Sequence, residues 1–237
     1  MVKCAVIIER YDISLGGAER SVSELAAQLR KSGVDVTILA AKGKSESAEA
    51  KILCGSYPGK RTPLNVFGGT LLKHLEDNDY DIVHSTLPFD FADVYQPRGG
   101  SYLEAMIRNA ASYSNVIVEF YKRLTHVTNY KRNVMVRAEK KLVENSCDTI
   151  IAGLSGYVAD QFERHYGLGS DRVEVITNGI DTKRFTGAQA EEQTRPRGKE
   201  SAAALRRKWL KKAAVEDSDE FVVFLFAANN FRLKGLP

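Results

Sequence analysis

The sequence predicts an α/β fold: a Rossmann-like, doubly wound parallel sheet, followed by only the start of a second Rossmann-like domain. Apolar segments typical of buried strands alternate with amphipathic helical segments over residues 1–180. Residues 3–40 contain a strand, a glycine loop, a helix and a strand, and a crossover of this length joins parallel strands. The strand segments are apolar at most positions, as in a sheet that is covered on both faces.

Each element follows from local patterns. Strands are expected at residues 3–8, 34–40, 51–54, 81–85, 92–95, 148–152 and 172–176. Helices are expected at residues 18–31, 66–78 and 155–166, with a largely helical region at 102–146 that breaks near 112–115. In the first helix, Val22, Leu25 and Leu29 recur at helical spacing. In the helix at 155–166, Ser155 is a suitable N-cap and Gly167 follows the last turn.

The pattern changes after residue 176, which predicts a domain boundary. A polar stretch with proline and glycine then precedes a basic helix at 199–212 and an apolar strand at 221–226. The predicted parts are a first domain at 1–180, a hinge and linker at 181–200, and the incomplete beginning of a second domain at 201–237. Because nothing in the sequence covers the strand at 221–226, this segment is expected to be disordered, to pair with another chain by self-association, or to dock on a sheet edge of the first domain.

The composition excludes several classes of protein. The chain has 237 residues, of which 43% are hydrophobic and 27% charged, as in ordinary globular proteins. No apolar run approaches the roughly 20 residues that span a bilayer, and the start lacks a signal peptide, so a cytoplasmic location is expected. No residue cluster has metal-ligand spacing, and neither a metal nor a cofactor is expected. Nucleic acid is not an expected partner, because the net charge is only +4 and no nucleic-acid motif is present.

Two places in the sequence suit an anionic ligand. Gly16 and Gly17 lie between the first strand and the first helix, where glycines allow a ligand to approach the free N–H groups of the helix start. A tight turn without a ligand explains them equally well, and the Gly-x-Gly-x-x-Gly fingerprint is absent. Arg232 and Lys234 follow the strand at 221–226, at the end of a parallel strand where ligands bind. A solvated pair of cations is the alternative.

Five segments occur in an order that resembles a known family. They are Gly16-Gly17-Ala18-Glu19-Arg20 and residues 33–39, 81–84, 173–181 and 231–235. This set is similar to the family 4 retaining glycosyltransferases, and residues 93–102 resemble a loop of their lipopolysaccharide-core glucosyltransferases. The resemblance implies the GT-B fold, in which two Rossmann-like domains face each other across a cleft. The amino-terminal domain would bind the acceptor and the carboxyl-terminal domain the nucleotide sugar.

The resemblance also implies roles for individual residues. It implies catalytic roles for His84 and Thr86, donor diphosphate binding by Gly16, Gly17, Arg232 and Lys234, acceptor binding by Arg98, Gly99, Gly100 and Tyr102, and a hinge at Asn178 and Gly179. Many members have a histidine at the position of Thr86, which here offers only a hydroxyl group. Without the resemblance, His84 is interpreted as a buried, hydrogen-bonded side chain, and the glycines after Arg98 as a turn.

A basic region at 119–142 suits an anionic partner. Its proposed membrane-facing cations are Lys122, Arg123, Lys131, Arg132, Lys140 and Lys141. Only Glu119 and Glu139 oppose the cations of this region, and aromatic and aliphatic residues lie among them. This mixture is typical of a helix on an anionic membrane surface, which predicts peripheral association with the inner face of the cytoplasmic membrane. A solvated basic face over an ordinary core is the alternative.

The resemblance therefore implies transfer of a hexose from a nucleotide sugar, with UDP-glucose the expected donor, to a glycolipid, polysaccharide or lipopolysaccharide-core acceptor, with retention of configuration. The family's glutamate pair falls beyond residue 237, so this truncated chain is expected to be inactive alone. One alternative is a non-catalytic acceptor-binding or membrane-binding subunit. Another is a different nucleotide-binding enzyme, such as a sugar-nucleotide epimerase.

Overall fold

The computed structural model describes residues 1–12, 17–44, 50–59, 61–113, 115–125, 129–145, 148–179 and 202–212. The chain divides into two units, Met1–Asn178 and Gly179–Pro237. Several sequence predictions lie outside the described residues: Gly16, the linker at 181–200, the strand at 221–226, and the pair Arg232 and Lys234.

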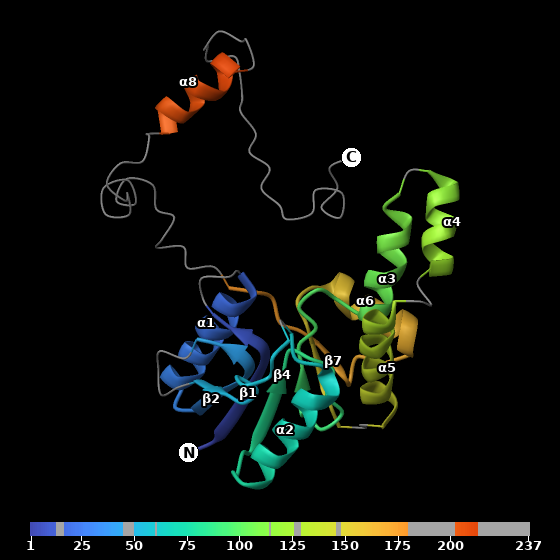
Figure 1. Cartoon of the computed structure of the whole chain (residues 1–237). Helices are drawn as coiled ribbons and strands as arrows, with labels where there is room; N and C mark the ends of the chain where they lie inside the picture. The colour runs from blue at the N-terminus through green and yellow to red at the C-terminus, as the bar shows by residue number, and fades with distance from the viewer. Residues whose placement is uncertain are drawn as a thin grey trace. The chain divides into compact units, whose positions relative to one another are not determined.

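The first unit is built on one parallel sheet (Figure 1). Its strands are β1 (Lys3–Tyr11), β2 (Asp35–Gly43), β3 (Ala50–Ile52), β4 (Ile82–Ser85), β5 (Val94–Tyr95), β6 (Ile150–Gly153) and β7 (Val173–Val175). The strand order is β3-β2-β1-β4-β5-β6-β7, and every neighbouring pair is parallel. The predicted doubly wound, Rossmann-like fold is confirmed.

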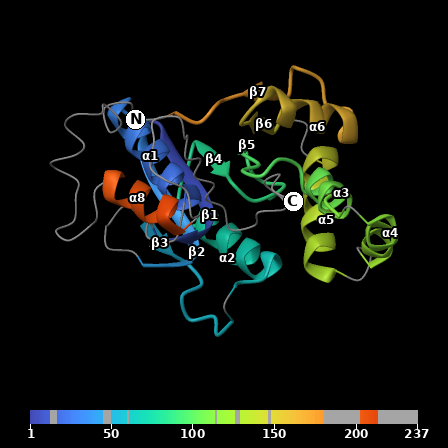
Figure 2. The same cartoon turned by 90° about the horizontal axis from the view of Figure 1, so that it is seen from above.

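Helices lie between β1 and β2, β3 and β4, β5 and β6, and β6 and β7, and they cover both faces of the sheet. They are α1 (Gly17–Lys31), α2 (Leu64–Glu76), α3 (Tyr102–Ala111), α4 (Val116–Thr125), α5 (Tyr130–Asn145) and α6 (Gly156–Tyr166). In the second unit the described element is α8 (Ala202–Lys212), which falls within the helix expected at 199–212. Seen from above, β1 lies between α1 and α2 (Figure 2).

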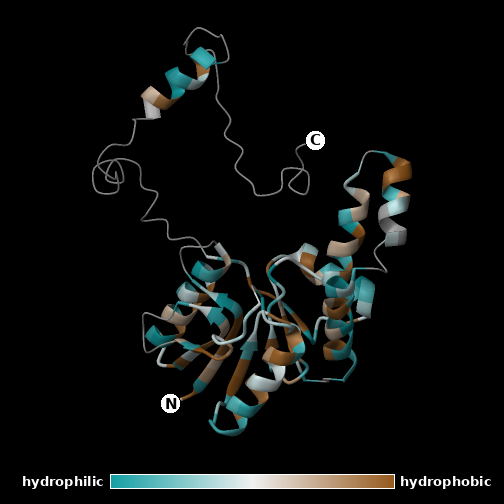
Figure 3. Cartoon of the chain, viewed as in Figure 1, coloured by the Kyte–Doolittle hydropathy of each residue, from teal (hydrophilic) through white to brown (hydrophobic). Residues whose placement is uncertain are grey.

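The alternation of side chains along β1 explains this layering. Val6 packs in one apolar cluster with Val22 of α1, whereas Ile7 packs in another with Phe67 and Leu71 of α2. Successive residues of a strand point to opposite faces, so a strand that is apolar at consecutive positions needs a helix on each side. In Figure 3 the strands are accordingly the most consistently apolar part of the unit.

The predicted helical region at 102–146 consists of three helices. The expected break near residues 112–115 is confirmed, because α3 ends at Ala111 and α4 begins at Val116. A second interruption, which we did not predict, separates α4 from α5. Asn115 and Asn129 precede the two new helices, and their side-chain oxygens accept hydrogen bonds from backbone N–H groups two or three residues ahead, as N-caps do.

The ends of α6 follow the sequence signals. The Ser155 hydroxyl accepts a hydrogen bond from the backbone N–H of Val158 at 3.4 Å, and Gly167 closes the helix in the left-handed conformation with φ of 66°. None of the helices in the described ranges is both long and apolar enough to cross a membrane.

Candidate ligand-binding cleft

The chain changes direction across the sheet between β1 and β4, and this opens a crevice. From β1 the chain continues to β2 on one side, whereas β4 lies on the other side of β1. The pairing of β1 with β2 extends to Tyr11, but its pairing with β4 ends at Ile7 and Ser85. Beyond this point the two strands separate, and such a switch point at the carboxyl ends of parallel strands is where open α/β sheets bind ligands.

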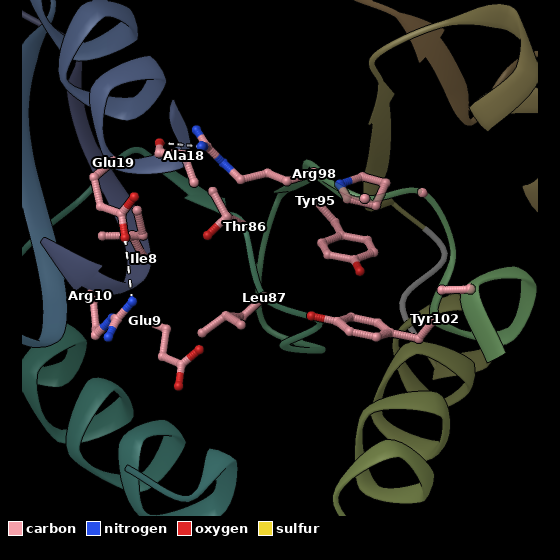
Figure 4. A pocket seen from close by; sticks show the side chains of 14 residues that line it. Ile8, Glu9, Arg10, Ala18, Glu19, Thr86, Leu87, Tyr95, Arg98 and Tyr102 are labelled. Carbon is pink, nitrogen blue, oxygen red and sulfur yellow. Dashed lines mark hydrogen bonds and ion pairs between the residues drawn. The ribbon is translucent and has the colours of Figure 1, made fainter. Parts of the chain in front are cut away.

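A cavity of about 290 Å³ occupies the crevice (Figure 4). We call it the central cavity; its lining includes Glu9 and Arg10 of β1, Glu19 of α1, Thr86 after β4, and Arg98 and Tyr102 after β5. In Figure 4 one wall comes from β1 and α1, and the opposite wall comes from the segment after β5. This segment contains four residues that the sequence analysis assigned to the acceptor: Arg98, Gly99, Gly100 and Tyr102.

Two further cavities adjoin the central one. The α1 cavity, of about 180 Å³, is lined by Gly17, Ser21, Gln96 and Asn178 and shares Ala18 and Arg98 with the central cavity. The α2 cavity, of about 360 Å³, is lined by residues before and within α2 and by the start of α5, and shares Glu9, Leu87 and Tyr102. The three cavities form one cleft along the carboxyl edge of the sheet.

Arg98 extends across the cleft from the β5 side. Its Nη1 group donates a hydrogen bond to the carbonyl oxygen of Ala18, in the first turn of α1. Burial lowers the pKa of Arg98, and the nearby Glu19 carboxylate opposes this effect. The Nε atom is buried and has no hydrogen-bond partner among the described residues. A buried guanidinium N–H without a partner, next to two cavities, is positioned to bind a polar or anionic ligand.

A buried carboxylate holds the wall that carries Arg98. Glu139 of α5 is fully buried and accepts hydrogen bonds from the hydroxyls of Tyr95, Ser101 and Tyr166 at 3.0, 2.9 and 2.8 Å. It also accepts one from the backbone N–H of Tyr102 at 2.9 Å. Burial raises the pKa of Glu139, although these hydrogen bonds act in the opposite direction. The sequence analysis placed Glu139 among surface charges; this is wrong, because the side chain lies in the core and ties β5, α3, α5 and α6 together.

The backbone of the same wall requires glycine at position 100. Its φ of +77° favours glycine, and a Cβ atom there would lie 2.5 Å from Oε1 of Gln161. That oxygen accepts a hydrogen bond from the backbone N–H of Ser101 at 2.9 Å. By contrast, a Cβ atom on Gly17 or Gly99 would meet no protein atom within 4 Å. Protein packing therefore explains why position 100 requires glycine. It does not explain why glycine occupies position 17, in the α1 cavity.

His84 and Thr86 occupy different environments. The Nε2 atom of His84 lies 3.3 Å from Oε1 of Gln96, and burial lowers the pKa of His84, which favours the neutral imidazole. His84 is not part of the lining of the central, α1 or α2 cavity. Thr86 does line the central cavity, and its hydroxyl donates to the carbonyl oxygen of Ile7 at 3.0 Å. With its proton engaged, Thr86 can offer a ligand only an acceptor oxygen.

The basic residues assigned to a membrane face on α5 have different neighbours. Lys131 lines the α2 cavity, and the Arg132 guanidinium donates to the side chain of Asn109 at 2.9 Å. At the other end of α5, Lys140 and Lys141 form ion pairs with Glu144 and Asp90 at 3.5 and 2.7 Å. The side chains of Lys122 and Arg123 lie outside the described part of the chain. Membrane contact through these six residues stays a prediction.

Sequence reasoning missed the supporting residues of the cleft. Glu139 lies three and four positions before Leu142 and Val143, and Gln161 lies between Val158 and Phe162, so both belong to the buried faces of their helices. That spacing could have identified them as buried polar groups. Within the described ranges, no group of three or more His, Cys, Asp or Glu side chains is placed to hold a metal ion.

The first unit is a parallel Rossmann-like sheet with its cleft at the switch point between β1 and β4. It therefore belongs to the class of α/β ligand-binding domains, which includes the domains of GT-B glycosyltransferases. The family assignment is more specific. The chain belongs to Glycosyltransferase Family 4, whose model matches residues 15–184. This span includes most of the described first unit and all the helices that line the cleft.

Solved structures show the same fold. One is WaaG, a glycosyltransferase involved in lipopolysaccharide biosynthesis, with a TM-score of 0.58 and 16% identity over 90% of this chain and 52% of that one. Another is sucrose-phosphate synthase from Thermosynechococcus elongatus, with a TM-score of 0.50 and 12% identity over 77% of this chain and 49% of that one. The chain thus spans about half the length of these structures. No curated protein sequence matches it.

Proposed function

We propose that the protein containing this chain is a glycosyltransferase that transfers a hexose from a nucleotide sugar to a glycolipid or lipopolysaccharide-core acceptor, with retention of configuration. The first unit is its acceptor side. The observation that carries the proposal is the cleft at the switch point of a family 4 domain, with the buried, unpartnered Nε of Arg98 beside it. UDP-glucose is the proposed donor.

The residues of the cleft contribute binding and orientation. The bond between the anomeric carbon and the diphosphate breaks, and its electron pair leaves with the diphosphate. The oxygen of the acceptor hydroxyl bonds to the same carbon, and the hydroxyl proton passes to the departing diphosphate. In this proposal Arg232 and Lys234 stabilise that charge, with the N–H groups at the start of α1 beside Gly17. Thr86 accepts a hydrogen bond from a sugar hydroxyl, because its own proton is donated to Ile7. Arg98 and Tyr102 position the acceptor.

Association with a membrane surface fits a glycolipid acceptor. The helix α4 exposes four large apolar or aromatic side chains, Val116, Ile117, Phe120 and Tyr121, between 62% and 78% exposed. Figures 1 and 3 show this helix beside α3, away from the sheet, with an apolar end. Exposed apolar groups on a helix next to basic residues favour the interface of an anionic bilayer. We therefore propose peripheral association at the inner face of the cytoplasmic membrane.

The test is a transfer assay with the full-length protein that contains this chain. Radiolabelled UDP-glucose and other nucleotide sugars are supplied with a glycolipid acceptor extract, and the anomer of the product is assigned by NMR. Transfer with retention is expected. Arg98→Gln is expected to lower kcat/KM by about 10²-fold, as the loss of a charged contact to a reacting ligand typically does. Arg137→Gln, an exposed change on α5 with the same loss of charge, serves as the matched control.

Two results would overturn the proposal: a folded protein that transfers no sugar from any nucleotide sugar, or equal activities for Arg98→Gln and Arg137→Gln. The exposed face of α4 favours a second candidate, an acceptor-binding or membrane-binding subunit without transfer activity. That candidate predicts binding to phosphatidylglycerol vesicles that falls on Ile117→Ser with Phe120→Ser, and no turnover of nucleotide sugar.

A further inference from the structure

We propose that the α2 cavity is a subsite for a phosphate monoester carried by the acceptor sugar. This inference rests on the proposed function, because it specifies the acceptor of that reaction. The cavity, of about 360 Å³, adjoins the central cavity through three shared residues: Glu9, Leu87 and Tyr102. A sugar whose reactive hydroxyl lies in the central cavity can therefore place a neighbouring substituent in the α2 cavity.

The amino-terminal end of α2 supplies N–H donors to this cavity. The first backbone bond of the helix runs from the N–H of Phe67 to the carbonyl of Pro63 at 3.0 Å, so the three preceding N–H groups lack intrahelical partners. The residue at the N-cap position is Pro63, and no side chain caps the helix. Pro63, Leu64 and Asn65 all line the cavity. An uncapped helix end of this kind binds anions, since its N–H groups and partial positive charge face the ligand.

A second observation points independently to a ligand at this place. Thr62 is only 8% exposed and lines the cavity, yet its hydroxyl has no hydrogen-bond partner among the described residues. A buried hydroxyl without a partner has lost its hydrogen bonds to water and gained none in return, so such groups in proteins are almost always satisfied. A phosphate oxygen at the start of α2 would accept this hydrogen bond.

The charges around the cavity favour an anion of the size of a phosphate. Arg61 lines the cavity from the residues before α2, and Lys131 lines it from the first turn of α5. The carboxylate of Glu9 opposes an anion, but it lies 3.8 Å from the guanidinium of Arg61, which partly neutralises it. Two cations from separate elements, together with the N–H groups of the helix end, match the several oxygens of a phosphate monoester.

The remainder of the cavity fits the sugar to which the phosphate is attached. Its walls include the apolar side chains of Phe67, Leu87 and Met135 and the rings of Tyr102 and Tyr130. Aromatic and apolar surfaces pack against the C–H faces of sugars, and pockets of about 300 Å³ or more accommodate small ligands. The combination of a charged end and an apolar wall distinguishes this cavity from a surface patch of cations.

The test follows backbone amide signals of the full chain by NMR during titration with inorganic phosphate, glucose 6-phosphate, glucose, and phosphatidylglycerol vesicles. We expect inorganic phosphate to shift the amides of residues 64–66 with a dissociation constant on the order of 1–10 mM. We expect glucose 6-phosphate to bind more tightly than inorganic phosphate, and glucose to cause no shift at these amides. Signals that respond to the vesicles and not to glucose 6-phosphate would assign the anion to a lipid headgroup and refute the sugar phosphate.

Four variants separate ligand binding from effects on folding. Arg61→Gln combined with Lys131→Gln is expected to weaken phosphate binding at least tenfold. Lys73→Gln, an exposed lysine in the last turn of α2, is the matched control and is expected to leave binding unchanged. Thr62→Val is expected to weaken binding about threefold to tenfold without lowering the melting temperature, because it removes a hydroxyl that has no protein partner. Glu9→Gln is expected to tighten binding up to about fivefold.

The subsite is refuted if tens of millimolar phosphate leave the amides of residues 64–66 unshifted. It is equally refuted if the double variant at Arg61 and Lys131 binds phosphate like the Lys73 control. These results are independent of the transfer assay. Transfer without phosphate binding would remove only the subsite, and phosphate binding in a protein without transfer activity would remove only the proposed reaction.

Discussion

Replacement of Glu139 by alanine is expected to destabilise the first unit strongly. The carboxylate accepts four hydrogen bonds, from the hydroxyls of Tyr95, Ser101 and Tyr166 and from the backbone N–H of Tyr102, and it is fully buried. Glu139→Ala leaves these donors without their acceptor and opens a cavity.

The size of the effect follows from the number of donors. A buried donor without an acceptor costs about 1–3 kcal/mol, so four of them at the lower limit give a loss of about 4 kcal/mol in the free energy of unfolding. This is a large part of the 5–15 kcal/mol that typically stabilises a domain. For a domain of this size, it corresponds to a decrease of roughly 8–16 °C in melting temperature.

Glu139→Gln is expected to be much milder. Three of the donors meet Oε2, and the fourth, the hydroxyl of Tyr95, meets Oε1. An amide oxygen can replace Oε2, and the Tyr95 hydroxyl can rotate to accept from the amide N–H group, so we expect a loss of about 1–2 kcal/mol. Because burial raises the pKa of Glu139 in the folded state, the part of the stability that depends on its titration is fully present below the ordinary pKa of 4.5 and is lost as the pH rises through the folded-state pKa, whereas the hydrogen bonds to the side chain remain. The glutamine variant lacks this pH dependence.

The measurement is urea-induced unfolding of the wild-type chain and the variants, followed by circular dichroism at several pH values. Glu144→Ala is the matched control, since Glu144 lies on the same helix, is 59% exposed and forms a surface ion pair with Lys140. It is expected to change stability by less than about 0.5 kcal/mol. A loss below 1 kcal/mol for Glu139→Ala, or equal losses for alanine and glutamine, would refute the reasoning that unsatisfied donors dominate.

Three further predictions concern single side chains. Burial raises the pKa of Glu104, but hydrogen bonds from its neighbours outweigh burial and lower the pKa to about 2. Glu104 therefore stabilises the fold above about pH 4.5, and this contribution is lost as the pH falls towards 2. In the Glu104→Gln variant, the free energy of unfolding measured between these pH values should depend less on pH. Gly100→Ala forces a Cβ atom to within 2.5 Å of Gln161 at a positive φ and should lower the free energy of unfolding by about 2 kcal/mol. Gly99→Ala, where a Cβ atom would meet no protein atom within 4 Å, should leave the melting temperature unchanged. Gly17→Ala should also preserve the melting temperature, because its Cβ meets no protein atom, but should weaken nucleotide-sugar binding in the full-length protein, measured by calorimetry.

The elements of the first unit were predictable because their signals are local. The apolar runs of β1 and β2 and the spacing of α1 each lie within about 15 residues, and the parallel order follows from the handedness and length of the crossovers. The interruption before α5 was missed because Asn129 was read as part of a continuous helix rather than as an N-cap. The strand expected at 221–226 lies outside the described residues, so it stays a prediction.

The cleft was only partly predictable. Arg98, Gly99, Gly100 and Tyr102 come together as one wall, and they were named because residues 93–102 resemble a loop of the lipopolysaccharide-core glucosyltransferases. The residues that hold this wall lie on helices far away in the sequence, and charge counting assigned Glu139 to the surface. Burial of a carboxylate depends on partners from several elements, and a sequence read one segment at a time does not reveal them.

The electrostatics around Arg98 explain why one end of the cleft suits an anion even before a ligand binds. Its guanidinium donates to Ala18 in the first turn of α1, so a cation lies beside the positive end of a helix dipole. Glu19 in the same turn compensates part of this charge, but Glu19 also lies 4.0 Å from Arg10, which adds a further cation. In the proposed reaction the diphosphate binds at the start of α1, next to this cation. A second anionic group at the start of α2 would lie on the other side of the central cavity, which leaves the neutral sugar between two charged ends.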